Sequence, residues 1–292
     1  MSDPRERIEA WLKAHEKPEI CIDYAKPEAP IPVGASKIGG CPDVPAGFVW
    51  PRHKDDAVME AGRKDMERPI AFMAQFDLAE VAAFDTQGLL PKAGHLLFFY
   101  DYECFDDGGD LCDEGSAARV FYFPPGAALE RMALPDDMGE DCDIPELALT
   151  FSTRTSRPVS NDWPEELFVR NSDGTQSREM ALFIKEYEDY GNKAEQGCKL
   201  LGNPFTIQNP MEDECQVAFM GIEWDALENP ETKAAMEAGM DDWVLLFQFD
   251  SIDVEGYADI MFCDSGALYF WIRKQDLAAG DFSHVYRCIQ FY

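Results

Sequence analysis

Two short motifs carry side chains that could form a polar binding site. Gln75 and Asp77 end one apolar run of the sequence, and Gln248 and Asp250 end another. If each run forms a strand, the two side chains of a motif point to the same face, because residues two apart share a face. Two amides and two carboxylates that met in a cleft could hold a polar or cationic ligand. The alternative is structural, since such side chains at strand ends also bind the backbone of turns.

Two further residues belong to this ligand-binding hypothesis. Trp50 follows a proline-rich segment and could cap a pocket, and Asp264 lies in a turn sequence followed by serine and glycine. The chain contains no Gly-x-Ser-x-Gly, Gly-x-x-x-x-Gly-Lys or Gly-x-Gly-x-x-Gly motif. We therefore assign no catalytic residue and no cofactor. His53 and His95 have no cysteine or second histidine at ligand spacing, so we expect no metal site.

A third candidate is an acidic loop that follows the apolar run at residues 96–100. Its carboxylates, which could contact a basic protein partner, are Asp106, Asp107, Asp110, Asp113 and Glu114. Carboxylates also bind calcium, but this loop lacks the regular spacing and the distal glutamate of an EF-hand. The pattern therefore favours a solvent-exposed loop over a calcium site.

The negative charge of the chain is concentrated in two segments. The net charge is −31, and residues 101–150 contain 14 acidic and 2 basic residues, while residues 201–250 contain 11 and 1. Such a field repels phosphate backbones and anionic membranes and attracts basic proteins. We therefore expect a basic protein partner and no nucleic-acid or membrane partner. The alternative is that these acids serve mainly solubility, and the oligomeric state stays open.

Three motifs of the first 100 residues recur in the same order in the last 100, which indicates an internal duplication. The matched positions, with offsets of 162, 173 and 172 residues, are Pro42 and Pro204, Gln75 and Gln248, and Gly94 and Gly266. The halves span about residues 30–126 and 196–290, and no recognisable linker separates them. We expect residues 1–292 to form a single compact domain in which an irregular connection joins two pseudo-symmetric halves.

Apolar runs and their periodicity predict the elements that position these residues. Helices are expected near residues 4–16, 177–190 and 230–238, and strands near 69–77, 96–100, 119–123, 215–221 and 243–249. A last hairpin is expected to pair residues 259–263 with 267–272, and residues 127–176 form the expected irregular connection. The predicted fold class is α+β, with largely antiparallel sheets and peripheral helices.

The same motifs resemble those of the YwqG-like family, a bacterial group of unknown function. The residues that carry the resemblance include Gly39-Gly40-Cys41-Pro42, Gln75-Phe76-Asp77 and Gly202-Asn203-Pro204, and it covers about residues 30–290. The resemblance implies an α+β fold of repeated, largely antiparallel sheets. It implies no established activity, although some relatives are suspected immunity proteins in toxin loci.

Two hypotheses for function follow. The first is a cytoplasmic, non-enzymatic protein whose acidic face binds a basic partner, with an immunity-type role as one form of it. The second is a small-molecule binding protein or enzyme that uses a cleft between the halves. The cytoplasmic location is expected because the nine cysteines form no Cys-x-x-Cys pair and the N-terminus is charged, with no apolar leader.

Overall fold

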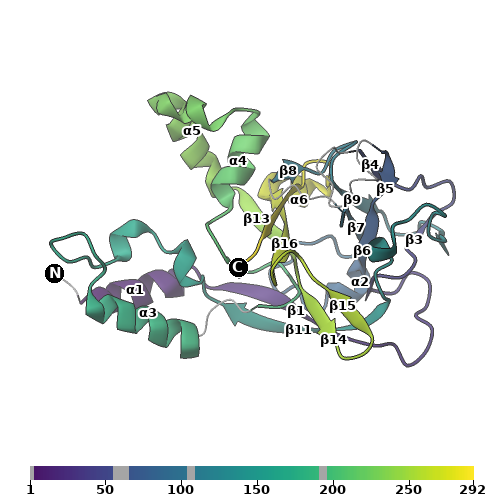
Figure 1. The fold of residues 1–292 in the computed structure, drawn as a ribbon, viewed down its shortest axis with the longest axis horizontal. Helices are drawn as coiled ribbons and strands as arrows, with labels where there is room; N and C mark the ends of the chain where they lie inside the picture. The colour runs from purple at the N-terminus through teal and green to yellow at the C-terminus, as the bar shows by residue number, and fades with distance from the viewer. Residues whose placement is uncertain (1–2, 55–65, 104–108, 191–195) are drawn as a thin grey trace.

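A large antiparallel sheet organises the protein. The computed structural model describes residues 3–54, 66–103, 109–190 and 196–292, and in this part 11 strands form one nearly closed sheet (Figure 1). In order across the sheet, the strands are β8 (Asp110–Leu111), β17 (Tyr286–Gln290), β16 (Ala267–Arg273), β13 (Trp243–Asp250), β12 (Lys199–Leu200), β1 (Lys17–Ala25), β11 (Leu147–Ser156), β2 (Lys37–Ile38), β6 (Ala71–Asp77), β7 (His95–Tyr100) and β9 (Ala118–Phe123).

The centre of the sheet is a long antiparallel pair that the sequence did not predict. β1 and β11 pair over nine residues, from Lys17 opposite Ser156 to Ala25 opposite Ala148. β2 joins the free edge of β11, and β12 joins the free edge of β1. The order of strands outward from this pair is therefore matched on the two sides, as β2-β6-β7-β9 and β12-β13-β16-β17.

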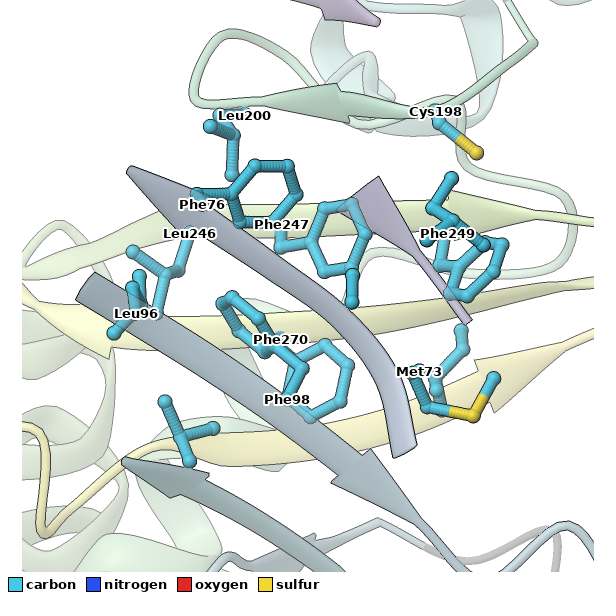
Figure 2. Packing of buried hydrophobic residues seen from close by; sticks show 14 of the residues in the cluster. Met73, Phe76, Leu96, Phe98, Cys198, Leu200, Leu246, Phe247, Phe249 and Phe270 are labelled. Atoms are coloured by element: carbon cyan, nitrogen blue, oxygen red, sulfur yellow. The ribbon is translucent and has the colours of Figure 1, made fainter. Parts of the chain in front are cut away.

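One apolar core lies between the two sides. The Phe76 ring centroid is 5.1 Å from that of Phe247, and Phe98 lies 4.8 Å from Phe247 and 4.9 Å from Phe270 (Figure 2). Phe76 and Phe98 come from β6 and β7, whereas Phe247 and Phe270 come from β13 and β16. Aromatic rings from both motif-bearing regions thus pack edge to face or tilted in one interior.

The helices and short elements lie around this sheet. The helices are α1 (Pro4–Ala14), α2 (Leu78–Val81), α3 (Arg178–Tyr190), α4 (Glu212–Met220), α5 (Pro230–Met240) and α6 (Lys274–Ala279). Single 3-10 turns are η2 (Glu140–Cys142), η3 (Ser160–Asp162), η4 (Glu165–Leu167) and η5 (Trp224–Glu228). Three two-stranded sheets pair β10 (Leu129–Arg131) with β3 (Asp43–Pro45), β14 (Ile252–Val254) with β15 (Ala258–Ile260), and β4 (Arg52–His53) with β5 (Arg68–Pro69).

Several predicted elements are confirmed and three are wrong. The helices expected near residues 4–16, 177–190 and 230–238 are α1, α3 and α5. The strand expected near 215–221 is α4, because three acidic residues favour its N-terminal turn and Gly221, at φ +62°, ends it in the left-handed region. The expected hairpin of residues 259–263 with 267–272 is wrong, since β16 pairs with β13 and β17. The connection 127–176 is not irregular, because it contains β11.

A helical arm, which we call the α1–α3 arm, extends from the ends of β1 and β11. There α1 and α3 lie side by side (Figure 1), and their apolar faces pack with Trp163 and Leu167. Asp162 ends η3 at the base of this arm, and its Oδ2 atom is buried without a hydrogen-bond partner. Burial raises the pKa of Asp162 to about 7, because the lost hydration of the ionised form outweighs the stabilising effects of Thr206 and Lys17.

This environment predicts a pH-dependent stability. The folded-state pKa of Asp162 is raised, so its favourable contribution is complete below the unfolded-state pKa and is lost as the pH rises through about 7. Asp162→Asn should therefore exceed the wild type in free energy of unfolding by about 1–3 kcal/mol at pH 8, and the gain should shrink toward pH 4. Urea denaturation at several pH values measures this. Asp189→Asn removes an exposed carboxylate of α3 and is the control; parallel profiles for Asp162→Asn and the wild type would contradict the prediction.

Candidate functional site

The side chains of the first predicted motif, Gln75 and Asp77, form hydrogen bonds within the fold, and Gln75 binds the residue that follows Pro42. Gln75 is fully buried on β6, and its Oε1 accepts a hydrogen bond of 2.9 Å from the backbone N–H of Asp43. Its Nε2 donates to the carbonyl of Ala35 at 2.8 Å and to Oδ2 of Asp43 at 2.8 Å. Asp77 accepts a hydrogen bond of 3.0 Å from the N–H of Ala79 and so caps α2. Both side chains therefore use their polar atoms on nearby backbone.

The second motif makes the corresponding contacts. Gln248 is fully buried on β13, and its Oε1 accepts from the N–H of Phe205 at 2.8 Å while its Nε2 donates to the carbonyl of Gly197 at 3.0 Å. Asp250 accepts hydrogen bonds from the N–H groups of Gly197, at 2.7 Å, and Ser251, at 2.8 Å. Burial raises the pKa of Asp250. A shared ligand of the four side chains stays a prediction, and such a ligand would have to displace these bonds.

A buried lysine stands beside each glutamine. Lys37 lies opposite Gln75 across β2 and β6, and Lys199 lies opposite Gln248 across β12 and β13. Both ammonium groups are almost completely buried, with exposed fractions of 0% and 1%. An isolated charge in such surroundings costs several kcal/mol, so each lysine requires a partner of opposite charge.

The partners are glutamates that flank or belong to the central strands. Nζ of Lys37 lies 2.9 Å from Oε2 of Glu146, which directly precedes β11, and it also donates to the carbonyl of Cys41 at 2.5 Å. Nζ of Lys199 lies 3.2 Å from Oε2 of the fully buried Glu19, on β1. Burial lowers the pKa of Lys199, and the charge of Glu19 opposes that effect. These pairs attach β2 and β12 to the central strands.

An arginine completes each group. Nε of Arg154 donates to Oε1 of Glu19 at 2.8 Å, and Nη1 of Arg131 lies 3.9 Å from Oε2 of Glu146. Arg131 also binds Asp43, with 2.9 Å from its Nε to Oδ1. Burial alone would raise the pKa of Asp43, but hydrogen bonds from Arg131 and from neighbouring donors hold it below its ordinary value. Glu19 and Glu146 thus each receive a lysine and an arginine.

The glycines of the repeated motif make room for these glutamates. Gly202 has φ +81°, and a Cβ atom there would lie 2.4 Å from Cβ of Glu19. Gly40 has φ +67°, and a Cβ atom there would lie 2.9 Å from Oε2 of Glu146. Each copy of the motif therefore contains a buried lysine, a glycine that leaves room for the glutamate paired with that lysine, and a proline. The backbone directly after the proline is bound by the glutamine. Sequence reasoning missed the lysines, although Lys37 and Lys199 share the 162-residue offset of the prolines.

The remaining predicted ligand-binding residues lie elsewhere. Trp50 is buried in the core, where its Nε1 donates to the carbonyl of Ile70 at 2.9 Å and its ring meets Phe99 edge-on. Asp264 is exposed in the turn before β16. Neither residue shares a hydrogen bond with the glutamine motifs in the described part of the chain.

The described carboxylates of the acidic loop have two different surroundings, since Asp110 is half-buried in an ion pair and Asp113 and Glu114 are exposed. Asp110 binds the buried Arg287 of β17, with 3.0 Å from Nε to Oδ1. Asp113 and Glu114 are exposed and line a hollow of about 390 Å³ together with Arg119. The predicted partner-binding residues Asp106 and Asp107 lie outside the described residues.

A second hollow lies where residues of the two sides meet. Its volume is about 520 Å³, and its walls come from residues 88–91 and from α6 with Val244. The two hollows share Tyr122 and Gly280. Polar and apolar atoms contribute to the walls of both hollows in nearly equal measure, and we call the two adjoining hollows the groove.

A further buried ionic cluster ties the hairpin β4–β5 to the end of β7. Nδ1 of His53 lies 2.6 Å from Oδ2 of Asp101, and Nε of Arg68 donates to Oδ1 of the same carboxylate at 3.2 Å. His53 and Arg68 are opposite each other in the hairpin, and Asp101 is fully buried. Sequence reasoning missed this cluster because its three members come from separate elements.

The described residues form neither a metal-binding cluster nor a membrane-spanning helix. No group of three or more histidine, cysteine, aspartate or glutamate side chains is arranged to hold a metal ion there. Within the same ranges, no helix combines the length and the apolar character needed to cross a membrane.

The buried ion pairs predict a large cost for Lys199→Met. The substitution removes one partner of a buried pair, and we expect a loss of about 3 kcal/mol in the free energy of unfolding. Arg154→Met removes a side chain that is 33% exposed, so it should cost clearly less. Adding Glu19→Met to Lys199→Met should restore part of the loss, because the uncompensated carboxylate is removed. Equal losses for Lys199→Met and Arg154→Met, measured by chemical denaturation, would contradict this account.

The close approach at Gly202 predicts a matched contrast with Gly47. Both glycines have left-handed backbones, at φ +81° and +84°, but a Cβ atom at Gly47 would meet nothing within 4 Å. Gly47→Ala should therefore cost about 1–2 kcal/mol through backbone strain alone. Gly202→Ala should cost about 1–3 kcal/mol more, because Glu19 must move. Thermal and denaturant unfolding of the two variants measures the difference, and similar values would show that the contact with Glu19 is unimportant.

Comparison with known proteins supplies a family but no activity. A family described as "Domain of unknown function (DUF1963)" matches residues 36–290. No curated protein matches the chain. The match spans both glutamine motifs, both buried lysines and both motif glycines. Because it covers most of the 292 residues, the chain belongs to the family of this domain of unknown function.

Proposed function

We propose that this protein is a non-enzymatic binding protein that engages a basic protein partner through an acidic face. The observation that carries the proposal is that parts of the two acidic segments, residues 110–114 and α4, meet at one edge of the sheet. β8 of the first segment pairs with β17, and α4 of the second segment packs against β8. The labels β8 and α4 lie close together in Figure 1.

Contacts between side chains hold the two segments together. Tyr286 lies opposite Leu111 in the pairing of β17 with β8, and its hydroxyl donates to Oε2 of Glu214 at 3.5 Å. Burial and the neighbouring charge of Asp213 raise the pKa of Glu214. Arg287, next in β17, neutralises Asp110. Carboxylates from both segments therefore lie at the same sheet edge.

Few basic residues compensate the exposed acids. Residues 212–242 contain ten acidic residues and one basic residue, Lys233, which pairs with Glu237 at 3.8 Å. Asp113 and Glu114 add exposed carboxylates on the β8 side. A field of one sign accelerates association with a partner of opposite charge and disfavours phosphate-bearing ligands.

A second candidate function is small-molecule binding in the groove between the two sides. The specific observation in its favour is the pair of hollows of about 390 and 520 Å³, because volumes of this size are typical of ligand sites. Their lining differs from the predicted Gln75, Asp77, Gln248 and Asp250. We rank this candidate second because, among the described residues that line the larger hollow, Lys274 is the single charged side chain.

Four narrower statements are also proposals. We propose that the two halves arose by duplication, which the matched strand order and the matched contacts of Gln75 and Gln248 support. The assignment to the YwqG-like family rests on the motif resemblance. The immunity-type role and the cytoplasmic location rest on sequence reasoning alone. An acidic face suits an immunity-type role, since it could cover a basic surface of a toxin.

Affinity capture tests the proposed function. The immobilised protein should retain a stoichiometric basic protein from its source lysate at about 50 mM salt and release it at about 500 mM, because salt screens exposed charges. Asp113→Asn with Glu114→Gln should reduce the captured amount about tenfold. Glu179→Gln with Asp189→Asn removes two exposed acids of α3 and should leave capture unchanged. A partner that is retained equally by both variants and at high salt would contradict the proposal.

A further inference from the structure

We propose that the helical arm of residues 212–242, formed by α4, η5 and α5, docks a basic amphipathic segment of the partner, with Trp224 as its apolar anchor. We call these residues the acidic arm. The inference rests on the proposed function, because it assigns the partner a place on the acidic face. It also names a feature that charge alone does not supply, namely an exposed aromatic side chain among carboxylates.

The exposure of Trp224 is unusual in this chain. All six tryptophans lie in the described residues, and Trp224 alone among them is exposed, at 52%. Phe219, five residues earlier, is 36% exposed. Tryptophan is the side chain most enriched among residues that dominate binding energy at protein interfaces. A tryptophan that no core requires therefore points to a contact outside the chain.

The backbone holds Trp224 in a defined position at the turn between two helices. α4 ends at Gly221, and η5 begins at Trp224. Asn229 caps the next helix, since its Oδ1 accepts from the N–H of Glu231 at 2.8 Å, and Pro230 occupies the first turn of α5. A fixed anchor loses little conformational entropy when a partner binds.

The base of the acidic arm is attached to the sheet. Gln216 of α4 accepts a hydrogen bond of 3.0 Å from Nε1 of Trp243, on β13. A Cβ atom at Gly239 would lie 2.4 Å from the Gln216 side chain, so α4 and α5 approach each other closely there. The arm therefore presents its tip as a rigid extension of the sheet, as its projection in Figure 1 illustrates.

The charges around the anchor select the chemistry of the partner. The exposed acids nearest to Trp224 in the sequence are Glu223, Asp225, Glu228 and Glu231. The Arg273 guanidinium lies 4.2 Å from the Phe219 ring centroid and pairs with Asp242 at 2.8 Å, so its charge is compensated at the base. The surface thus fits a lysine- or arginine-rich segment that also carries a bulky apolar side chain.

A peptide titration tests this surface directly. The probe is a tryptophan-free synthetic peptide of about 20 residues, with lysines on one helical face and leucines on the other. At about 0.15 M salt it should bind and shift to shorter wavelength the part of the emission that is absent from Trp224→Ala, and a labelled form should bind Trp224→Ala at least about tenfold more weakly. Leu182→Ala is the matched control, because Leu182 is 56% exposed on α3. A peptide with serines in place of the leucines should bind more weakly to the wild type.

Equal affinity of the leucine peptide for the wild type and Trp224→Ala would overturn the assignment to the acidic arm. If Asp113→Asn with Glu114→Gln still reduced capture of the natural partner about tenfold, the proposed function would stand with its contact at β8. If the wild-type protein captured no salt-sensitive basic partner, the proposed function itself would be contradicted.

Collisional quenching provides a measurement that needs no partner. For the part of the emission that Trp224→Phe removes, the ratio of caesium to iodide quenching should be several-fold higher than the ratio for free N-acetyltryptophanamide, because the surrounding carboxylates concentrate cations. A ratio equal to or below that of the free compound would overturn the proposed electrostatic environment.

Discussion

The burial of two lysine ammonium groups is the constraint on which the sheet depends. Lys37 and Lys199 lie on β2 and β12, the strands next to the central pair. Each ammonium group is compensated by a glutamate, Glu146 directly before β11 and Glu19 on β1. β2 and β12 have only two residues each, so their short ladders alone give few hydrogen bonds. The ion pairs fix their register, because a shift of one residue would move the lysine to the opposite face and leave the glutamate unpaired. This constraint also explains the other residues of the motif. The glycines leave room for the glutamate, and the glutamines bind the backbone of the turn that follows the proline.

The buried polar side chains of this arrangement stabilise the fold. Both glutamines are bound to backbone, and the cluster of His53, Arg68 and Asp101 joins a hairpin to β7. Acidic residues outnumber basic ones by 56 to 25, and carboxylates of residues 110–114 and of α4 lie together where β8 forms the edge of the sheet. A charged edge suits recognition of another macromolecule, whereas the larger hollow carries little charge, and this difference orders the two proposed functions.

Sequence analysis predicted the helices and strands that have a local sequence pattern. The runs that became β6, β7, β13 and β16 are continuously apolar, and α1, α3 and α5 have helical periodicity or clear caps. β11 was missed because its sequence, Leu147–Ser156, is rich in threonine and serine and is half exposed, so that its place at the centre is set by pairing with β1. The pairing of β8 with β17 joins residues more than 170 positions apart, and no local pattern reports it. The lysine–glutamate pairs had a signal in the repeated Lys37 and Lys199, but their partners lie outside the repeat.

We propose the acidic edge, formed by β8 and residues 212–242, as the binding surface. Hydrogen–deuterium exchange of the protein, alone and with the salt-sensitive partner, tests it most directly because protection locates the contact on the chain. The account predicts slower exchange in β8 and in residues 212–242, with little change in the central strands. Protection confined to residues 88–91 and α6 would contradict it and would place the contact in the groove between the two sides.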